Sequence, residues 1–400
     1  MTLLVTGIGQ LVTNDESNGG LLGVVADAAV AIERGDIVWV GRAERVPERY
    51  ASSRMLDVAG AAVLPGFVDA HTHVVFAGDR SQEFAMRLEG ATYEEILGTG
   101  GGIYSTVRAT RAATLDELVD ASLPRVERML ASGTTTIEIK TGYGLDVDTE
   151  VKMLDAIDRI CNVLAIDTLP TYLGAHVVAP EFRDDRASYL DLVAGEMLDA
   201  VADRVAFIDV FCDEAAFTVA ETRRVVAAGR VRGLGVRIHA DQLSSSGGSA
   251  LAAEVGAVAA DHLDHATDED LAALAEAGTV AVLLPGVSYS MREPAPDGRR
   301  IWDAGVTVAI ATDCNPGTSY IETMPFVISL AAITTGMTLT ESVWSATRGG
   351  ALALGLHDRG VIAPGKLADL VVLDAPSYEH LAYRPDGGLV TQVIKRGNLL

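Results

Sequence analysis

Eight apolar runs alternate with helix-forming segments between residues 62 and 311, and this alternation constrains the fold more than any other feature of the chain. Parallel strands are covered by helices on both faces of their sheet, so their sequences are continuously apolar. Three intervening segments begin with a helix N-terminal signal, a threonine followed three residues later by an acid, at 114–117, 218–221 and 267–270. The apolar runs are 62–68, 134–139, 168–173, 206–211, 235–238, 257–260, 279–284 and 306–311.

Eight strands with crossover helices predict an α/β fold, a (β/α)8 TIM-like barrel. A doubly wound open sheet is the alternative that the same alternation allows. Its nucleotide-binding versions lose support, because no Gly-x-Gly-x-x-Gly turn follows an early strand and no Walker sequence is present. Residues 1–63 and 362–400 instead have the pattern of short strands joined by tight turns. We therefore expect one small β domain built from both chain ends and a barrel domain over 64–361.

The strong negative charge of the chain limits its partners. The formal net charge is −24, from 55 acidic and 31 basic side chains, and such a charge repels nucleic acid and anionic lipid. We therefore expect neither nucleic acid nor a membrane as a partner. The three cysteines form no Cys-x-x-Cys pair, so a disulfide framework is not expected. Without a secretory leader or a long apolar stretch, the sequence predicts a cytoplasmic protein.

Histidines and an acid follow the apolar runs where a barrel carries its chemistry, at the carboxyl ends of the strands. His71 and His73 end the first run, and their i, i+2 spacing puts both imidazoles on one face of a strand. His239 follows the fifth run and Asp313 the eighth. These four side chains predict a mononuclear metal site with an open position for water, which accepts one Zn²⁺ or Fe ion. Because such a metal lowers the pKa of its water, the sequence predicts a hydrolase in which Asp313 also takes the water's proton.

Longer motifs resemble one protein family. The stretch Pro-Gly-Phe-Val-Asp-Ala-His-Thr-His at 65–73, together with Ala-Thr-Asp at 311–313, is similar to the amidohydrolase superfamily. More specific stretches are similar to the imidazolonepropionases of histidine degradation; they lie at 90–96, 100–103, 105–111, 142–146, 173–176, 280–286 and 315–317. The resemblance covers nearly the whole chain. It implies a metal-dependent barrel joined to a small β-sandwich, and a homodimer is common among such barrels.

The resemblance also implies a reaction, the hydrolysis of the cyclic amide of 4-imidazolone-5-propanoate to N-formimino-L-glutamate. The propionate of this small anionic heterocycle needs a cation, and Arg80, in the loop that leaves the first run, is placed to bind it through a bidentate pair. A surface arginine is the alternative. The resemblance places His262 beside the metal, where it would stabilise an oxyanion or relay a proton. It further implies substrate contacts by Tyr93, Tyr143, His176, Asn315, Gly317 and Thr318, with helix packing as the alternative for Tyr93 and a structural histidine as that for His176.

Gln242 departs from the family pattern. It stands three residues after His239, where many imidazolonepropionases and related deaminases have glutamate. Glutamine can hold a ring N–H and a carbonyl but cannot shuttle protons. We therefore expect Gln242 to bind substrate and Asp313 to act as the base.

Other interpretations of these strand-end residues stay open. A purine or pyrimidine deaminase is the nearest, although that branch uses the glutamate which Gln242 replaces. A binuclear enzyme would need a carbamylated lysine after the fourth strand, where this chain has Asp213 and Glu214; Lys140 follows the second strand. A catalytically silent binding protein is the rival from a different class, and such relatives lose their metal ligands first.

Overall fold

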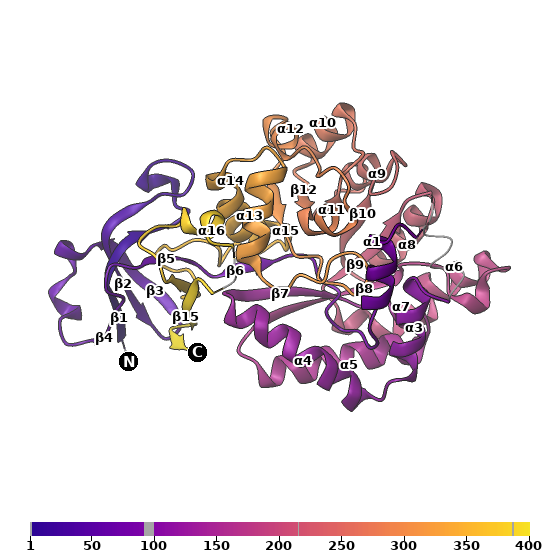
Figure 1. The fold of residues 1–400 in the computed structure, drawn as a ribbon, viewed down its shortest axis with the longest axis horizontal. Coiled ribbons are helices and arrows are strands. Elements are labelled where there is room, and N and C mark those ends of the chain that lie inside the picture. Colours follow the sequence, from indigo (N-terminus) through magenta and orange to yellow (C-terminus); the bar gives the residue numbers. More distant parts are fainter. Residues whose placement is uncertain (1, 92–99, 215, 386–387) are drawn as a thin grey trace.

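The computed structural model describes residues 2–91, 100–214, 216–385 and 388–400, and a parallel barrel dominates it (Figure 1). Its eight strands pair in sequence order. Just beyond the strand ends, Thr72 bridges Cys314 and the amide of Asp313 donates to the carbonyl of His71 at 3.0 Å, which brings the last strand to the first. The predicted (β/α)8 barrel is confirmed. The strands are β6 (Phe67–Asp69), β7 (Thr134–Lys140), β8 (Asp167–Ala175), β9 (Phe207–Cys212), β10 (Gly235–Ala240), β11 (Ala259–His262), β12 (Val280–Leu283) and β13 (Val308–Ile310).

Helices surround this barrel (Figure 1). The threonines at 114, 218 and 267 each form a full capping box with the acid three residues on, as the sequence predicts. Among the described residues, no helix has the length and apolar character needed to cross a membrane. The α-helices are α1 (Ser81–Leu88), α3 (Ile103–Ala112), α4 (Leu115–Ala131), α5 (Val147–Val163), α6 (Arg186–Ala194), α7 (Glu196–Val201), α8 (Val219–Val231), α9 (Gly248–Glu254), α10 (Asp268–Ala277), α11 (Pro285–Met291), α12 (Gly298–Asp303), α13 (Met324–Thr334), α14 (Leu339–Trp344), α15 (Gly350–Ala353) and α16 (His380–Tyr383), with a π-helical turn at Ser345–Gly349 between α14 and α15.

Both chain ends build a second, mixed sheet, as predicted. Its order is β16-β15-β14-β5-β1-β2-β3, with β4 paired to β1, and it encloses a core of its own. Figure 1 shows this sheet at one end of the molecule, beside the barrel, with both termini in it. Its strands are β1 (Thr2–Leu11), β2 (Val25–Glu33), β3 (Asp36–Arg42), β4 (Arg54–Asp57), β5 (Ala62–Pro65), β14 (Leu370–Leu373), β15 (Val390–Lys395) and β16 (Asn398–Leu399).

The first apolar run differs from the prediction. Residues 62–68 are one run in the sequence but two strands in the structure, because β5 pairs with β14 in the mixed sheet and β6 pairs with β7 in the barrel. Gly66 separates them, and its amide donates to the carbonyl of Asp369. A Cβ at this position would lie 2.3 Å from the hydroxyl of Thr135, so only glycine fits where the chain passes from the mixed sheet to the barrel. The predicted domain boundary between 63 and 64 falls inside β5; the boundaries remain a prediction.

Alternate residues of the barrel strands point inward, and they form layers. On β9, Phe207 lies in the apolar interior, whereas Ile208 packs toward the helices. Two residues beyond Phe207 comes Asp209, which is fully buried. On β10 the same spacing of two residues separates Arg237, which is also fully buried, from His239 near the end of the strand. The strand period therefore places charged residues inside the barrel, directly beneath the strand ends.

Candidate metal centre

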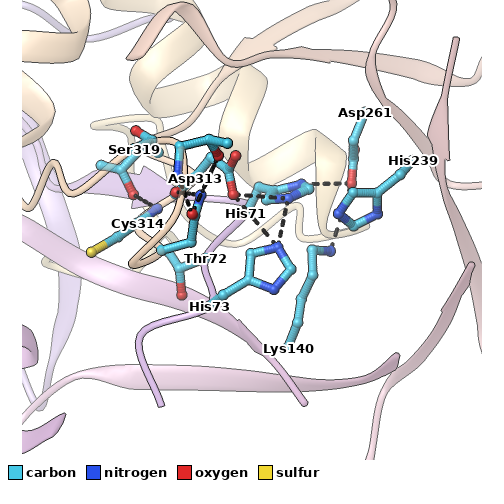
Figure 2. Close-up of polar contacts among 12 residues, drawn as sticks. His71, Thr72, His73, Lys140, His239, Asp261, Asp313, Cys314 and Ser319 are labelled. Carbon is cyan, nitrogen blue, oxygen red and sulfur yellow. Dashed lines mark hydrogen bonds and ion pairs between the residues drawn. The ribbon is translucent and has the colours of Figure 1, made fainter. Parts of the chain in front are cut away.

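The four predicted metal ligands lie together at the carboxyl ends of the barrel strands. The Nε2 atoms of His71 and His73 are 3.3 Å apart, and Asp313 Oδ1 lies 3.5 Å from each of them. The ring centroid of His239 is 4.6 Å from that of His71. Donor atoms of the three histidines all lie within 4.8 Å of one another. Figure 2 shows the rings of His71 and His73, from the segment after β6, converging with the ring of His239 and the carboxylate of Asp313.

The donor atoms fit a cation. Burial lowers the pKa of His71 and of His73 well below the usual value, with Lys140 and His176 respectively acting in the same direction, so both imidazoles are neutral and offer a lone pair. Asp313 Oδ1 is buried and accepts no hydrogen bond from the described residues. Buried acceptors are normally satisfied, so a convergent set of lone pairs around an unpartnered carboxylate oxygen is the chemistry of a metal site.

Two buried carboxylates fix the orientation of the histidines. Asp261 Oδ2 lies 2.8 Å from His71 Nδ1, and Asp209 Oδ2 lies 3.0 Å from His239 Nδ1. A carboxylate that accepts the Nδ1 proton leaves Nε2 without one, so that Nε2 could bind a metal ion. Asp261 is visible in the sequence as a polar residue after the sixth run, although without a role, whereas Asp209 lies within the fourth run and was not predicted. The signal was present, because each acid interrupts an otherwise apolar strand, and a charge inside a buried strand needs a partner.

Lys140 lies at the centre of this buried charge cluster. Its Nζ is 2.8 Å from both Glu138 Oε1 and Asp209 Oδ2 and 3.6 Å from Asp261 Oδ2. Burial disfavours the charged lysine, but Asp209 and Glu138 outweigh it and raise its pKa. Arg237 binds both oxygens of Asp261 at 2.9 and 3.0 Å. Three carboxylates therefore face two cations, and the excess negative charge under the histidines favours a bound cation.

Asp313 and the loop after it form one side of the site. Burial raises the pKa of Asp313 to about 7, against the opposing effect of His239. The side chain of Asn315 donates to the carbonyl of Asp313 at 2.7 Å and accepts from the amides of Gly317 and Thr318, both at 2.8 Å. Of the three loop residues expected to contact substrate, Asn315 therefore also fixes the loop that follows Asp313.

Tyr143 and His176 line the neighbouring side. His176 stacks on His73 with ring centroids 5.2 Å apart, and the ring of Tyr143 is 5.4 Å from that of His176. Burial, aided by His239, lowers the pKa of His176 to about 3, and burial together with Asp313 raises the pKa of Tyr143. Both groups are neutral near pH 7. They offer hydrogen bonds to an uncharged polar ring.

Arg80 lies at the rim of the site. It precedes α1, its Nε donates to Glu83 Oε2 at 2.8 Å, and its other nitrogens face Gly317. Arg80 and Thr318 line one cavity of about 540 Å³. The structure therefore brings Arg80 to the loop that follows Asp313. Tyr93 lies outside the described residues.

The remaining predicted residues border the site. The ring centroid of His262 is 5.3 Å from that of His239, and burial and His239 lower the pKa of His262 well below its usual value. Gln242 is half-buried at the end of β10. The amide of the next residue, Leu243, donates to Asp213 at 3.0 Å, which gives Asp213 a role in holding this loop. Glu214 is exposed.

Comparisons with known proteins identify the family. The profile of the amidohydrolase family matches residues 62–400. Over 399 residues the chain is 50% identical to the imidazolonepropionase of Streptomyces griseus, covering 99% of this chain and 98% of that protein. It is equally identical to the imidazolonepropionase of Streptomyces coelicolor, with 98% of each chain covered. The chain belongs to the imidazolonepropionase family of amidohydrolases.

Solved structures outside the imidazolonepropionases share the fold. An atrazine chlorohydrolase from Arthrobacter aurescens, complexed with zinc, aligns with a TM-score of 0.74 at 19% identity over 100% of this chain and 95% of that one. A guanine deaminase from C. acetobutylicum aligns with a TM-score of 0.76 at 14% identity over the full length of both chains. At such identities the likeness concerns the fold alone.

Proposed function

We propose that the chain hydrolyses the cyclic amide of 4-imidazolone-5-propanoate to N-formimino-L-glutamate in histidine degradation. The observation that carries this proposal is the convergence of His71, His73, His239 and Asp313 at the strand ends of a chain that is 50% identical to imidazolonepropionases. As a member of this family, the chain is a hydrolase. The site supplies neutral hydrogen-bonding groups for a ring and an arginine for a carboxylate.

We propose that these four residues hold one Zn²⁺ or Fe ion per subunit. When bound, the ion would polarise the ring carbonyl and lower the pKa of water. The neutral Nε2 atoms and the otherwise unpartnered oxygen of Asp313 suit either metal, because imidazole and carboxylate ligands bind both.

Asp313 is proposed as the base and His262 as its assistant. The carboxylate of Asp313 can take a proton from the attacking water and later release it to the departing ring nitrogen. His262 is neutral because its pKa is low, and it can therefore donate an N–H to the oxyanion that develops on the ring carbonyl. The product is the open-chain formimino acid.

Substrate orientation is proposed to depend on the surrounding side chains. The two Nη atoms of Arg80 bind the propionate while Glu83 holds its Nε. Tyr143 and His176 flank the ring, and Gln242 holds a ring N–H and carbonyl without exchanging protons. The loop residues Asn315, Gly317 and Thr318 close the remaining side, and Tyr93 is proposed to contact the substrate as well.

We further propose that the chain works in the cytoplasm as a homodimer, with a barrel domain over 64–361 and the small domain over 1–63 and 362–400. The acidic surface charge supports the absence of nucleic acid and membrane partners. Sedimentation velocity at micromolar protein tests the dimer, because a monomer of 41.9 kDa would contradict it.

The test of the reaction is a direct assay. Zinc-loaded and iron-loaded protein is mixed with 4-imidazolone-5-propanoate, and the loss of ring absorbance is compared with spontaneous decay. We expect turnover with at least one metal and none with Asp313→Asn, whose amide cannot act as a base. Decay at the spontaneous rate with both metals would contradict the proposal, and ammonia release from a purine or pyrimidine would instead favour a deaminase.

A further inference from the structure

A buried glutamate holds the loop that carries Tyr143. Glu150, in the first turns of α5, is fully buried and reaches back toward loop 142–145. Its Oε1 accepts from the amides of Gly144 at 2.9 Å and Leu145 at 2.8 Å, and its Oε2 accepts from the amide of Gly142 at 3.1 Å. A single carboxylate therefore satisfies three amides on either side of Tyr143.

The backbone of this loop adopts conformations that need an anchor. Gly142 has φ +102° and Leu145 has φ +59°, which is costly for a residue with a branched side chain. At Gly144, a Cβ would lie 2.7 Å from Glu150 Oε1, so the close approach of the carboxylate requires glycine there. Glu150 thus requires glycine at 144, whereas glycine at 142 is required by its positive φ and by the carbonyl of Leu173, which would lie 2.7 Å from a Cβ there.

The loop that Glu150 holds is coupled to the candidate site through a second residue, His176. The carbonyl of Gly142, whose amide Glu150 holds, lies 3.0 Å from His176 Nδ1. A carbonyl can only accept, so this contact requires the proton on Nδ1 and leaves Nε2 of His176 as an acceptor. His176 in turn stacks on His73 and packs against Tyr143. One loop conformation thereby sets both side chains.

Glu150 is also costly to bury. Burial raises its pKa, and no cation forms a salt bridge with it in the described part of the chain. Its charge is compensated by the side chain of Thr141 and by the backbone amides of the loop, an arrangement that works only while the loop keeps its present shape. A side chain needed only to fill space could be apolar.

We propose that Glu150 is a positioning residue for substrate binding: its carboxylate fixes loop 142–145 and thereby the hydroxyl of Tyr143 and the Nδ1–H tautomer of His176. This inference rests on the proposed function in one respect, that Tyr143 and His176 face the substrate. The alternative is a purely structural role, in which Glu150 stabilises the start of α5 and nothing more.

The experiment compares metal-loaded Glu150→Gln with the wild type and with Thr218→Ala. The amide of glutamine accepts through one oxygen only and turns an N–H₂ group toward the loop amides. We expect KM for 4-imidazolone-5-propanoate to rise about tenfold and kcat to change less than threefold, because an imprecisely placed binding group weakens substrate binding. The metal content stays at the wild-type value. Thr218→Ala removes the capping box of α8, lowers thermal stability and leaves KM unchanged.

A spectroscopic readout separates positioning from stability. Nitrogen-15 spectra of protein labelled at histidine report the tautomer of His176, identified by the loss of its resonances in His176→Gln. We expect the Nδ1–H form in the wild type and in Thr218→Ala and a mixture of tautomers in Glu150→Gln. If Glu150→Gln does not fold, Glu150→Asp retains the charge but withdraws it by one methylene, and the same shifts are expected.

Lower thermal stability of Glu150→Gln with an unchanged KM and an unchanged His176 tautomer would overturn the inference. If the wild type fails to turn over the substrate, the proposed function fails instead, and the tautomer of His176 alone decides the role of Glu150.

Discussion

Replacing Asp261 by asparagine tests whether the buried carboxylates serve the metal site. The change keeps the size of the side chain and removes the charge that accepts the proton of His71 Nδ1 at 2.8 Å. Loss of such a supporting carboxylate typically weakens metal binding by about 10- to 100-fold, which is about 1.4–2.7 kcal/mol. The same change deprives Arg237 of a carboxylate that it binds through both oxygens.

The loss of the carboxylate that pairs with Arg237 should also lower the stability of the protein. Leaving a buried charge uncompensated costs about 3–5 kcal/mol. Glu138 Oε1 lies 3.9 Å from Arg237 Nε and compensates part of the charge, so we expect the lower end of this range. The free energy of unfolding of metal-free Asp261→Asn should therefore fall by about 3 kcal/mol, measured by urea denaturation, while competition with a chelator measures its metal affinity.

Two matched substitutions serve as controls. Asp209→Asn makes the same change beside His239, but its cationic partner is Lys140, which can lose a proton where Arg237 cannot. It should weaken metal binding similarly and cost less stability. Asp264→Asn changes a carboxylate that touches no predicted ligand and lies 3.9 Å from His262 Nδ1; its metal affinity should equal that of the wild type. Wild-type metal affinity in Asp261→Asn, or equal losses in all three variants, would refute the reasoning.

Three other substitutions probe separate parts of the molecule. Arg80→Ala should raise KM at least tenfold with metal content unchanged, because it removes the partner of the propionate; lost metal or unaltered kinetics would show that Arg80 is misplaced. Gln242→Glu should keep kcat within about tenfold of the wild type, and abolished turnover would show that the amide itself is required. The pKa of Asp167 is lowered to about 2, because Lys395 and its neighbouring arginines outweigh burial. Its stabilisation is thus complete only well above pH 3.8 and is lost as the pH falls through about 2. Asp167→Asn should therefore lower the free energy of unfolding by about 1–2 kcal/mol at pH 6 and by clearly less at pH 2.5, as measured in urea; an equal loss at both pH values would contradict this.

The barrel was predictable because parallel strands have a strong sequence signal. The run 134–139 corresponds to β7 at Thr134–Lys140, and the run 206–211 to β9 at Phe207–Cys212. The run 62–68 was misread as one strand, because apolar character does not reveal which sheet a strand joins. Which sheet each part of this run joins depends on β14 and on Thr135, which packs against Gly66, and both are distant in the sequence.

Of the candidate site, the side chains at the strand ends could be predicted from the sequence, but the charged pairs beneath them could not. Strand-end histidines are visible in the sequence, since position along a barrel strand has a functional meaning. The pairing of Lys140 with Asp209, or of Arg237 with Asp261, joins different strands, and single-sequence patterns carry no information on such partners. The support of Tyr143 by Glu150 was hidden for the opposite reason: the contact is local, but a glutamate near the start of a helix is commonly a surface residue.

The passage of the chain from the mixed sheet to the barrel at Gly66 has a consequence for the order in which parts of the protein can fold. β5 leads through Gly66 into β6, which ends two residues before His71, and β5 is held by β14, which emerges late from a translating ribosome. Until β14 and Asp369 are available, the segment that presents the first two histidines has no partner on one side. Domains generally fold during synthesis from the N-terminus onward. In this chain β5 therefore gains its β14 neighbour only after residues 370–373 have been synthesised, although β6, which follows it, pairs with β7 within the barrel.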